Sequence, residues 1–179
     1  MGEQKKILLI DFCNYEDYPI GGHLSFAKNM ILSFQNELVL IGITTHKEDP
    51  IGRWFKKNIN GITYDFFALA RYDKTKTKHY IPDRLVSYFL LKYFKRKILT
   101  KNIQNVFIQR TDILQAVKNF GFKNICYRFA GLENPLKFSK YWYAKFAAKF
   151  FDKEFFSSFK NVQLILASGD RNSIEQMSI

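Results

Sequence analysis

The chain lacks several patterns that would assign it to a common class of protein. Only two of its 179 residues are cysteines, and Cys13 and Cys126 match neither a metal-binding spacing nor a redox Cys-x-x-Cys pair. We therefore expect free thiols in a reducing compartment. The sequence also has no Gly-x-Ser-x-Gly motif and no cluster of metal-binding residue types, so it supports neither a hydrolase nor a metal site.

Long apolar runs are missing as well. The apolar run at Ile7–Ile10 is too short for the core of a signal peptide, and no stretch approaches the ~20 apolar residues of a membrane-spanning helix. We expect a cytoplasmic protein that is soluble or peripheral on the inner face of the membrane.

Acidic residues are scarce relative to basic ones. The chain has 28 Lys and Arg against 16 Asp and Glu, a formal net charge of +12. Such a surplus attracts nucleic acid, anionic lipid headgroups or phosphorylated small molecules, and charge alone does not choose among them. The basic residues are spread over several segments, so a solvated surface accounts for them equally well.

What the chain has in abundance is apolar and aromatic side chains. Its 47% hydrophobic and 17% aromatic content can fill the core of one ordinary domain, which we expect to span residues 1–179. Strand-like apolar runs alternate with helical patterns. The expected strands are 7–10, 38–41, 62–69, 105–108, 124–129 and 162–167, and the expected helices are 24–34, 85–99, 111–120 and 139–159. This order predicts an α/β fold, a Rossmann-like doubly wound, mainly parallel sheet of about six or seven strands with helices on both faces.

Local signals mark the ends of several elements. Asn60-Gly61 predicts a tight hairpin turn. Thr111 or Asp112 is expected to cap the third helix, and Ser139 the fourth. The chain stops soon after its last strand, so we expect the natural protein to continue beyond Ile179.

A pair of glycines follows the first strand, at the edge where doubly wound sheets bind ligands. Gly21 and Gly22 allow the backbone to approach a ligand closely, and the amides of the helix that His23 begins favour an anion such as phosphate. The three-glycine dinucleotide fingerprint and the P-loop lysine are both absent, which disfavours a nicotinamide enzyme and a P-loop protein. A simple turn is the alternative explanation for the glycine pair.

Polar residues also follow the later strands. Arg110 and Asp112 come after the fourth strand, and Arg128, Glu133 and Asn134 come at the end of the fifth or just after it. The arginines suit a carboxylate or phosphate ligand, although structural ion pairs at the sheet edge would explain them equally well.

The last long helix combines a basic face with an aromatic one. The lysine row is Lys145, Lys149 and Lys153, and the aromatic row is Trp142, Phe146 and Phe150. Such a helix either lies on an anionic membrane surface or covers the sheet while its lysines face solvent.

Several short segments, taken together, resemble the N-terminal half of a GT-B glycosyltransferase of the group-1, family-4 kind, including its bacterial polysaccharide-type members. They are Lys6–Ile10, Gly21–Leu24, Leu164–Ser168, and Phe129–Pro135 followed by Ser139–Tyr141.

The resemblance implies a two-domain enzyme that transfers a sugar from a nucleotide-sugar donor and uses no other cofactor. This half would bind a glycan or lipid-linked acceptor, and a C-terminal donor-binding domain beyond this chain would complete the site. Gly21 and Gly22 would approach the donor diphosphate and sugar. The family's E-x7-E pair belongs to the second domain, and Gly131–Glu133 stands where members often carry a histidine, so no catalytic residue is assigned.

Two other functions fit the same sequence. One is a stand-alone basic α/β module that binds nucleic acid or another anionic partner without catalysis, although we expect nucleic acid less than the transfer reaction. The other is a non-catalytic domain whose apolar edge docks a partner chain.

Overall fold

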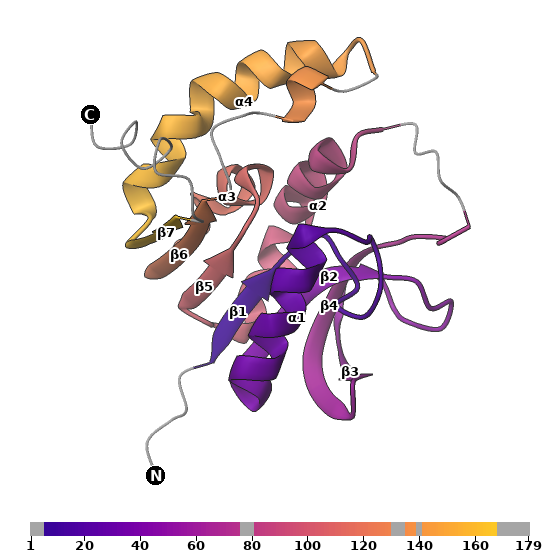
Figure 1. Ribbon diagram of the computed structural model, residues 1–179. Coiled ribbons are helices and arrows are strands. Elements are labelled where there is room, and N and C mark those ends of the chain that lie inside the picture. The colour runs from indigo at the N-terminus through magenta and orange to yellow at the C-terminus, as the bar shows by residue number, and fades with distance from the viewer. Residues whose placement is uncertain (1–5, 76–80, 130–134, 139–140, 168–179) are drawn as a thin grey trace.

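Seven strands form a single sheet in the order β3-β4-β2-β1-β5-β6-β7 (Figure 1). The computed structural model describes residues 6–75, 81–129, 135–138 and 141–167. The strands are β1 Ile7–Ile10, β2 Leu38–Thr44, β3 Trp54–Ile59, β4 Ile62–Arg71, β5 Asn105–Ile108, β6 Asn124–Phe129 and β7 Leu164–Ala167. Neighbouring strands are parallel except for β3 and β4, which form an antiparallel hairpin. The predicted Rossmann-like, mainly parallel sheet is thus confirmed.

Helices cover both faces of the sheet, as the alternating sequence pattern predicted (Figure 1). They are α1 Gly22–Phe34, α2 Asp83–Ile98, α3 Thr111–Val117 and α4 Ala144–Ser158. Successive side chains of a strand point to opposite faces, and β1 shows the consequence. Leu8 and Ile10 join the core beneath α2, α3 and α4, whereas Leu9 joins the core beneath α1. A strand buried on both faces needs the continuous apolar run that the sequence shows at residues 7–10.

The strand order reverses at β1. From β1 the chain passes through α1 to β2 and then forms the β3-β4 hairpin on one side of the sheet. Helix α2 then crosses back, so that β5 pairs with the opposite edge of β1. The carboxyl ends of β1 and β5 therefore flank the point at which ligands bind in sheets of this type.

The hairpin turn is confirmed at Asn60-Gly61. Both residues have positive φ angles, 51° and 84°, as a two-residue type I′ turn requires.

Two details of helix ends differ from the sequence predictions. The cap of α3 is Arg110, with no capping side-chain hydrogen bond, so the prediction of Thr111 or Asp112 as the cap is wrong. The Thr111 hydroxyl lies 3.2 Å from that of Tyr127, and the Asp112 carboxylate binds arginines, so tertiary contacts take both side chains away from the helix amides. Helix α3 also ends at Val117 rather than Phe120. Ser139 lies outside the described residues, and α4 begins at Ala144.

Among the described helices, none combines the length and apolar character needed to cross a bilayer.

Candidate functional site at the carboxyl ends of β1 and β5

The loop between β1 and α1 is held by its own side chains. Asn14 is fully buried, and its Oδ1 accepts the backbone N–H groups of Glu16, Asp17 and Tyr18 at 3.0, 2.9 and 2.8 Å. Its Nδ2 donates to Asp17 Oδ1 at 2.9 Å. One buried amide thus supplies the hydrogen bonds that this irregular backbone cannot make with itself.

Tyr15 attaches the same loop to the sheet. It is buried with a positive φ of 66°, and its hydroxyl donates to the Ile41 carbonyl at 2.7 Å while accepting the Asp11 N–H at 3.1 Å. Gly42 lies directly beneath, where a Cβ would come 2.3 Å from the Cys13 carbonyl and 2.7 Å from the Tyr15 ring. Glycine at position 42 is therefore required for the loop to seat on β2.

The glycine pair at the start of α1 lies in open space. A Cβ built at Gly21 or Gly22 would meet no atom within 4 Å, and Gly21 has φ 157° and ψ 177°, a combination that L residues rarely adopt. Gly21 is the N-cap, so no side chain caps the helix, and the first turn contains no acidic residue. The first amides of α1 are thus left without a side-chain partner at the positive end of the helix dipole.

Gln109, which follows β5, joins the parts of this site. Its Nε2 donates to Asp11 Oδ2 at 2.5 Å and to the His23 carbonyl at 3.1 Å. Its Oε1 accepts a hydrogen bond from Arg128 Nη1 at 3.3 Å. Gln109 and Asp11 are each 1% exposed, so this network fixes the ends of β1, β5 and β6 to the first turn of α1.

Arg128 is the cation that binds Gln109 in this network. Its guanidinium lies 4.3 Å from the centroid of the Phe26 ring on α1, a cation–π distance. It makes no ion pair with a carboxylate among the residues that the structure describes, and its side chain is only partly buried. The guanidinium is therefore positioned without being neutralised.

Burial controls the ionisation of two groups here. Burial raises the pKa of Asp11, against the opposing effects of Arg110 and His23. Burial lowers the pKa of His23, and Asp11 counteracts that shift only in part. His23 Nδ1 is buried and has no hydrogen-bond partner among the described residues.

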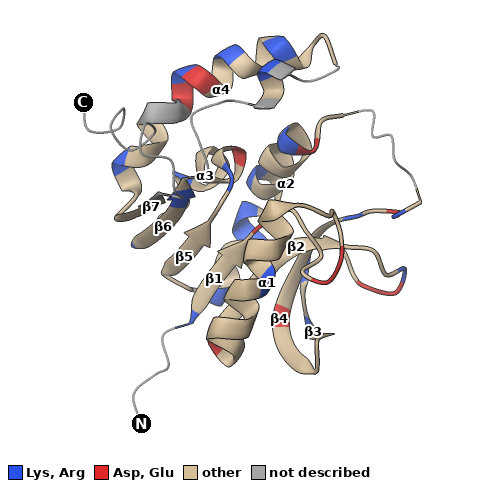
Figure 2. Cartoon of the chain, viewed as in Figure 1, with Lys and Arg blue, Asp and Glu red and all other residues tan. Residues whose placement is uncertain are grey.

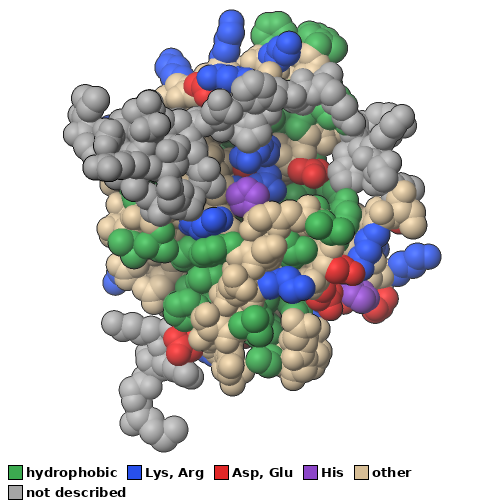
Figure 3. Space-filling view, in the orientation of Figure 1, with side chains coloured by type: hydrophobic (Ala, Val, Ile, Leu, Met, Phe, Trp, Pro, Cys, Tyr) green, Lys and Arg blue, Asp and Glu red, His purple; other side chains and the backbone are tan. Residues whose placement is uncertain are grey.

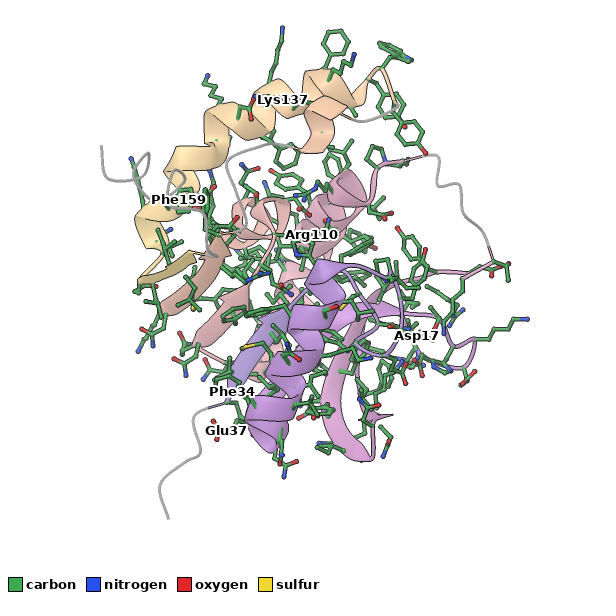
Figure 4. The ribbon with its side chains drawn as sticks, viewed as in Figure 1. Asp17, Phe34, Glu37, Arg110, Lys137 and Phe159 are labelled. Atoms are coloured by element: carbon green, nitrogen blue, oxygen red, sulfur yellow. The ribbon has the colours of Figure 1, made fainter. Side chains whose placement is uncertain are left out.

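Arg110 and Asp112 form a second, adjacent cluster that is buried (Figure 4). Arg110 binds Asp112 through two hydrogen bonds, Nε to Oδ1 at 3.1 Å and Nη2 to Oδ2 at 2.8 Å. Arg84 Nη1 donates to the same Oδ1 at 3.0 Å, and the Ser87 hydroxyl donates to Oδ2. Burial acts to raise the pKa of Asp112, but Arg110, Arg84 and Ser87 outweigh it, so the pKa is lowered. The geometry favours the structural ion pair as the explanation of Arg110.

The structure thus divides the predicted residues into three groups. Gly21, Gly22, His23 and Arg128 come together at one place, because Gln109 binds both the His23 carbonyl and Arg128. Arg110 and Asp112 bind each other beneath it. Glu133 and Asn134 lie outside the described residues.

Sequence reasoning assigned no specific role to the two residues that connect the site, Asp11 and Gln109. The signal was present, because each is the first polar residue after a strand-length apolar run.

Within the described ranges, no group of three or more His, Cys, Asp or Glu side chains could hold a metal ion.

Comparisons with known proteins support the fold but identify no family. No protein-family model matches the chain, and no curated protein sequence matches it either. Among solved structures, sucrose-phosphate synthase from Thermosynechococcus elongatus superimposes with a TM-score of 0.54 and 13% sequence identity over 90% of this chain. The chain spans 41% of that protein. At this identity the likeness demonstrates a shared fold and nothing finer.

Proposed function

We propose that this chain is the acceptor-side domain of a glycosyltransferase, which transfers a sugar from a nucleotide-sugar donor to a glycan or lipid-linked acceptor. The observation that carries the proposal is the open glycine loop at the reversal point of the sheet. Its helix N-terminus has no side-chain cap and is joined through Gln109 to Arg128, which has no carboxylate partner among the described residues. The fold is shared with a sucrose-phosphate synthase, whose name describes the synthesis of a phosphorylated sugar, and this supports the choice of reaction class.

The chemistry of transfer requires stabilisation of the leaving diphosphate. The amides of Gly22 and His23 and the Arg128 guanidinium supply two kinds of anion-stabilising group, a helix dipole and a planar cation. The absence of a Cβ at Gly21 and Gly22 leaves room for the phosphates and the transferred sugar to contact backbone. A second domain, which we expect beyond Ile179, would bind the nucleotide and close over this edge, and closure would orient the acceptor hydroxyl.

The test uses the complete product of the gene that encodes this chain. The protein is incubated with a panel of nucleotide sugars, with and without glycan or lipid-linked acceptors, and the release of nucleoside diphosphate is measured. We expect release that depends on the acceptor for at least one donor. A panel in which no donor yields nucleoside diphosphate, with the protein folded, would contradict the proposal.

A matched pair of variants tests the role of the loop. Gly22→Val fills the open space above the loop, and Ser33→Val adds the same branched side chain at an exposed position near the other end of α1. We expect Gly22→Val to raise the KM for the donor at least about ten-fold, equivalent to ~1.4 kcal/mol of binding, while Ser33→Val leaves it unchanged. If the two variants have the same KM for the donor, the donor does not bind at this loop.

A further inference from the structure

An exposed aromatic ridge runs across the outer surfaces of α2 and α4. Its members are Trp142, Phe146 and Phe150 of the α4 segment and Phe89 and Tyr93 of α2, which are 73, 66, 50, 64 and 79% exposed. The α4 helix packs on the domain with its other face, where Ala144, Ala148 and Phe151 are buried. The helix therefore covers the fold with one face, as one of the two sequence alternatives predicted, and presents its aromatic row outward.

Ring contacts connect the two helices beneath the ridge through Tyr88, which is itself buried. The Trp142 and Phe146 rings lie 5.9 Å apart, and Phe150 contacts Tyr88 of α2 at 6.3 Å. Tyr88 in turn lies 5.4 Å from Phe89. Large aromatic side chains gathered in this way on a surface mark an interaction site, whereas single exposed ones do not.

Lysines flank the ridge on the same outer surface. Lys145, Lys149 and Lys153 are exposed along α4, as is Lys92 on α2. Figure 2 marks the Lys and Arg positions of α4 in blue, and Figure 3 shows blue Lys or Arg side chains beside green hydrophobic ones along the outer edge of α4. Within the described part of the chain, none of Lys92, Lys145 and Lys149 forms an ion pair.

The carboxylates of α4 are engaged elsewhere. Asp152 Oδ2 binds Lys137 Nζ at 2.8 Å, and Glu154 binds Lys118 of the segment after α3. The acidic charges of the helix are therefore neutralised by intramolecular pairs, and the charge that remains on its outer surface is positive.

We propose that the aromatic ridge and its lysines form a docking surface for an anionic lipid bilayer. Trp142, Phe146 and Phe150 would enter the headgroup and acyl boundary, and Lys145 and Lys149 would contact lipid phosphates. This surface rests on side chains that the proposed transfer reaction does not use, so either proposal can fail without the other.

The charge and shape of the ridge select a bilayer over two other occupants. In a symmetric dimer the same patch would face itself, and its lysines would repel each other. Single-stranded nucleic acid is bound in positively charged grooves, whereas these aromatics stand on the convex outer surface of helices. A flat, negatively charged and partly apolar surface fits both properties.

Vesicle binding tests the lysines. The 179-residue protein is sedimented at low salt with vesicles of phosphatidylcholine alone or with a third of the lipid replaced by phosphatidylglycerol. We expect binding to the anionic vesicles only, and a loss of roughly five-fold in affinity for each of Lys145→Gln and Lys149→Gln, because a basic residue near an anionic surface contributes about that factor.

A control variant separates this surface from net charge. Lys28→Gln with Lys123→Gln removes two exposed lysines that lie on α1 and just before β6. We expect this double variant to bind nearly as tightly as the parent protein. An equal loss from the control pair would show attraction by net charge and overturn the proposal, as would equal binding to neutral vesicles.

Tryptophan fluorescence tests the aromatics directly. The chain has two tryptophans, and Trp54 is bound through its Nε1 to the Lys97 carbonyl at 3.0 Å on the hairpin side of the sheet. In Trp54→Phe, the remaining Trp142 should shift its emission to shorter wavelength on anionic vesicles and be quenched by brominated lipid. In Trp142→Phe, the remaining Trp54 should show neither effect.

Two further results would assign the ridge to another occupant. Protection of Trp142 by single-stranded DNA but not by vesicles would replace the bilayer with nucleic acid. A dimer in sedimentation velocity that Phe146→Lys dissociates would replace it with a second copy of the chain. Circular dichroism of each variant verifies that these exposed substitutions leave the fold intact.

Discussion

At the scale of single residues, Gly42 tests how the loop of the site is seated. A methyl group at position 42 would overlap the Cys13 carbonyl and the Tyr15 ring, and neither can move without disturbing the loop. We expect Gly42→Ala to lower the free energy of unfolding by about 1–3 kcal/mol, the usual cost of overpacking a core. Urea denaturation measures the change. Gly22→Ala is the matched control, because its Cβ meets open space, and it should stay within about 0.5 kcal/mol of the parent.

His23 makes a pH-dependent contribution to stability. Burial lowers the pKa of His23 below its usual 6.5, so near that pH the unfolded chain binds more protons than the folded one. The free energy of unfolding should therefore rise as pH increases through the range just below and around 6.5. Urea titrations at about pH 5.5 and about pH 7.5 should show a smaller rise for His23→Gln than for the parent protein. The control is His46→Gln, which removes an exposed imidazole. If the two variants reduce the pH-dependent rise in the free energy of unfolding by the same amount, burial of His23 is not its cause.

At the scale of elements, Asp112 joins α2 to α3. Loss of a helix cap costs about 1 kcal/mol, whereas removing one partner of a buried ion pair costs about 3–5 kcal/mol. We expect Asp112→Ala to fall in the higher range, because it leaves Arg110 and Arg84 without their carboxylate. Thr111→Ala should cost about 1 kcal/mol, since it removes only a hydroxyl contact with Tyr127. Thermal and urea unfolding of the two variants distinguish these magnitudes, and similar small losses would contradict the buried cluster.

At the scale of the whole molecule, the side of the sheet that α1 covers retains apolar surface that α1 does not bury. Beside α1 lies an apolar pocket of about 430 Å³, lined by residues of α1, β1, β5, β6 and β7, including Met30, Phe107 and Leu166. On the edge strand β7, Leu164, Ile165 and Leu166 are each at least 40% exposed. An exposed apolar edge strand promotes pairing between chains.

We expect this chain to self-associate with rising concentration through that edge. Leu166→Lys should reduce the association, because it places a charge on the apolar strand. Ile20→Lys, at an isolated residue that is 93% exposed, makes the same change in charge away from the sheet. Sedimentation velocity should therefore show less association for Leu166→Lys than for Ile20→Lys, and the reverse order would place the contact elsewhere.

The backbone framework of this protein follows from its local sequence. Continuous apolar runs such as Ile7–Ile10 in β1 and residues 106–108 in β5 determined the strands, because only a parallel sheet covered on both faces buries every residue of such a run. Three further features were likewise predictable, since they depend on turn chemistry and on the order of elements. They are the position of the glycine pair at the start of α1, the hairpin at Asn60-Gly61 and the reversal of strand order beside β1.

Only the tertiary structure decided which polar side chains bind one another. Arg110 and Arg128 looked alike in the sequence, yet Asp112 neutralises the first, whereas Gln109 and Phe26 position the second. The aromatic row of α4 likewise has the spacing of a core face, and its exposure follows from the side of α4 that packs on the domain. Such outcomes depend on contacts between residues that are distant in the chain, so local sequence determined the elements and their order, while packing determined which of their side chains remain free to act.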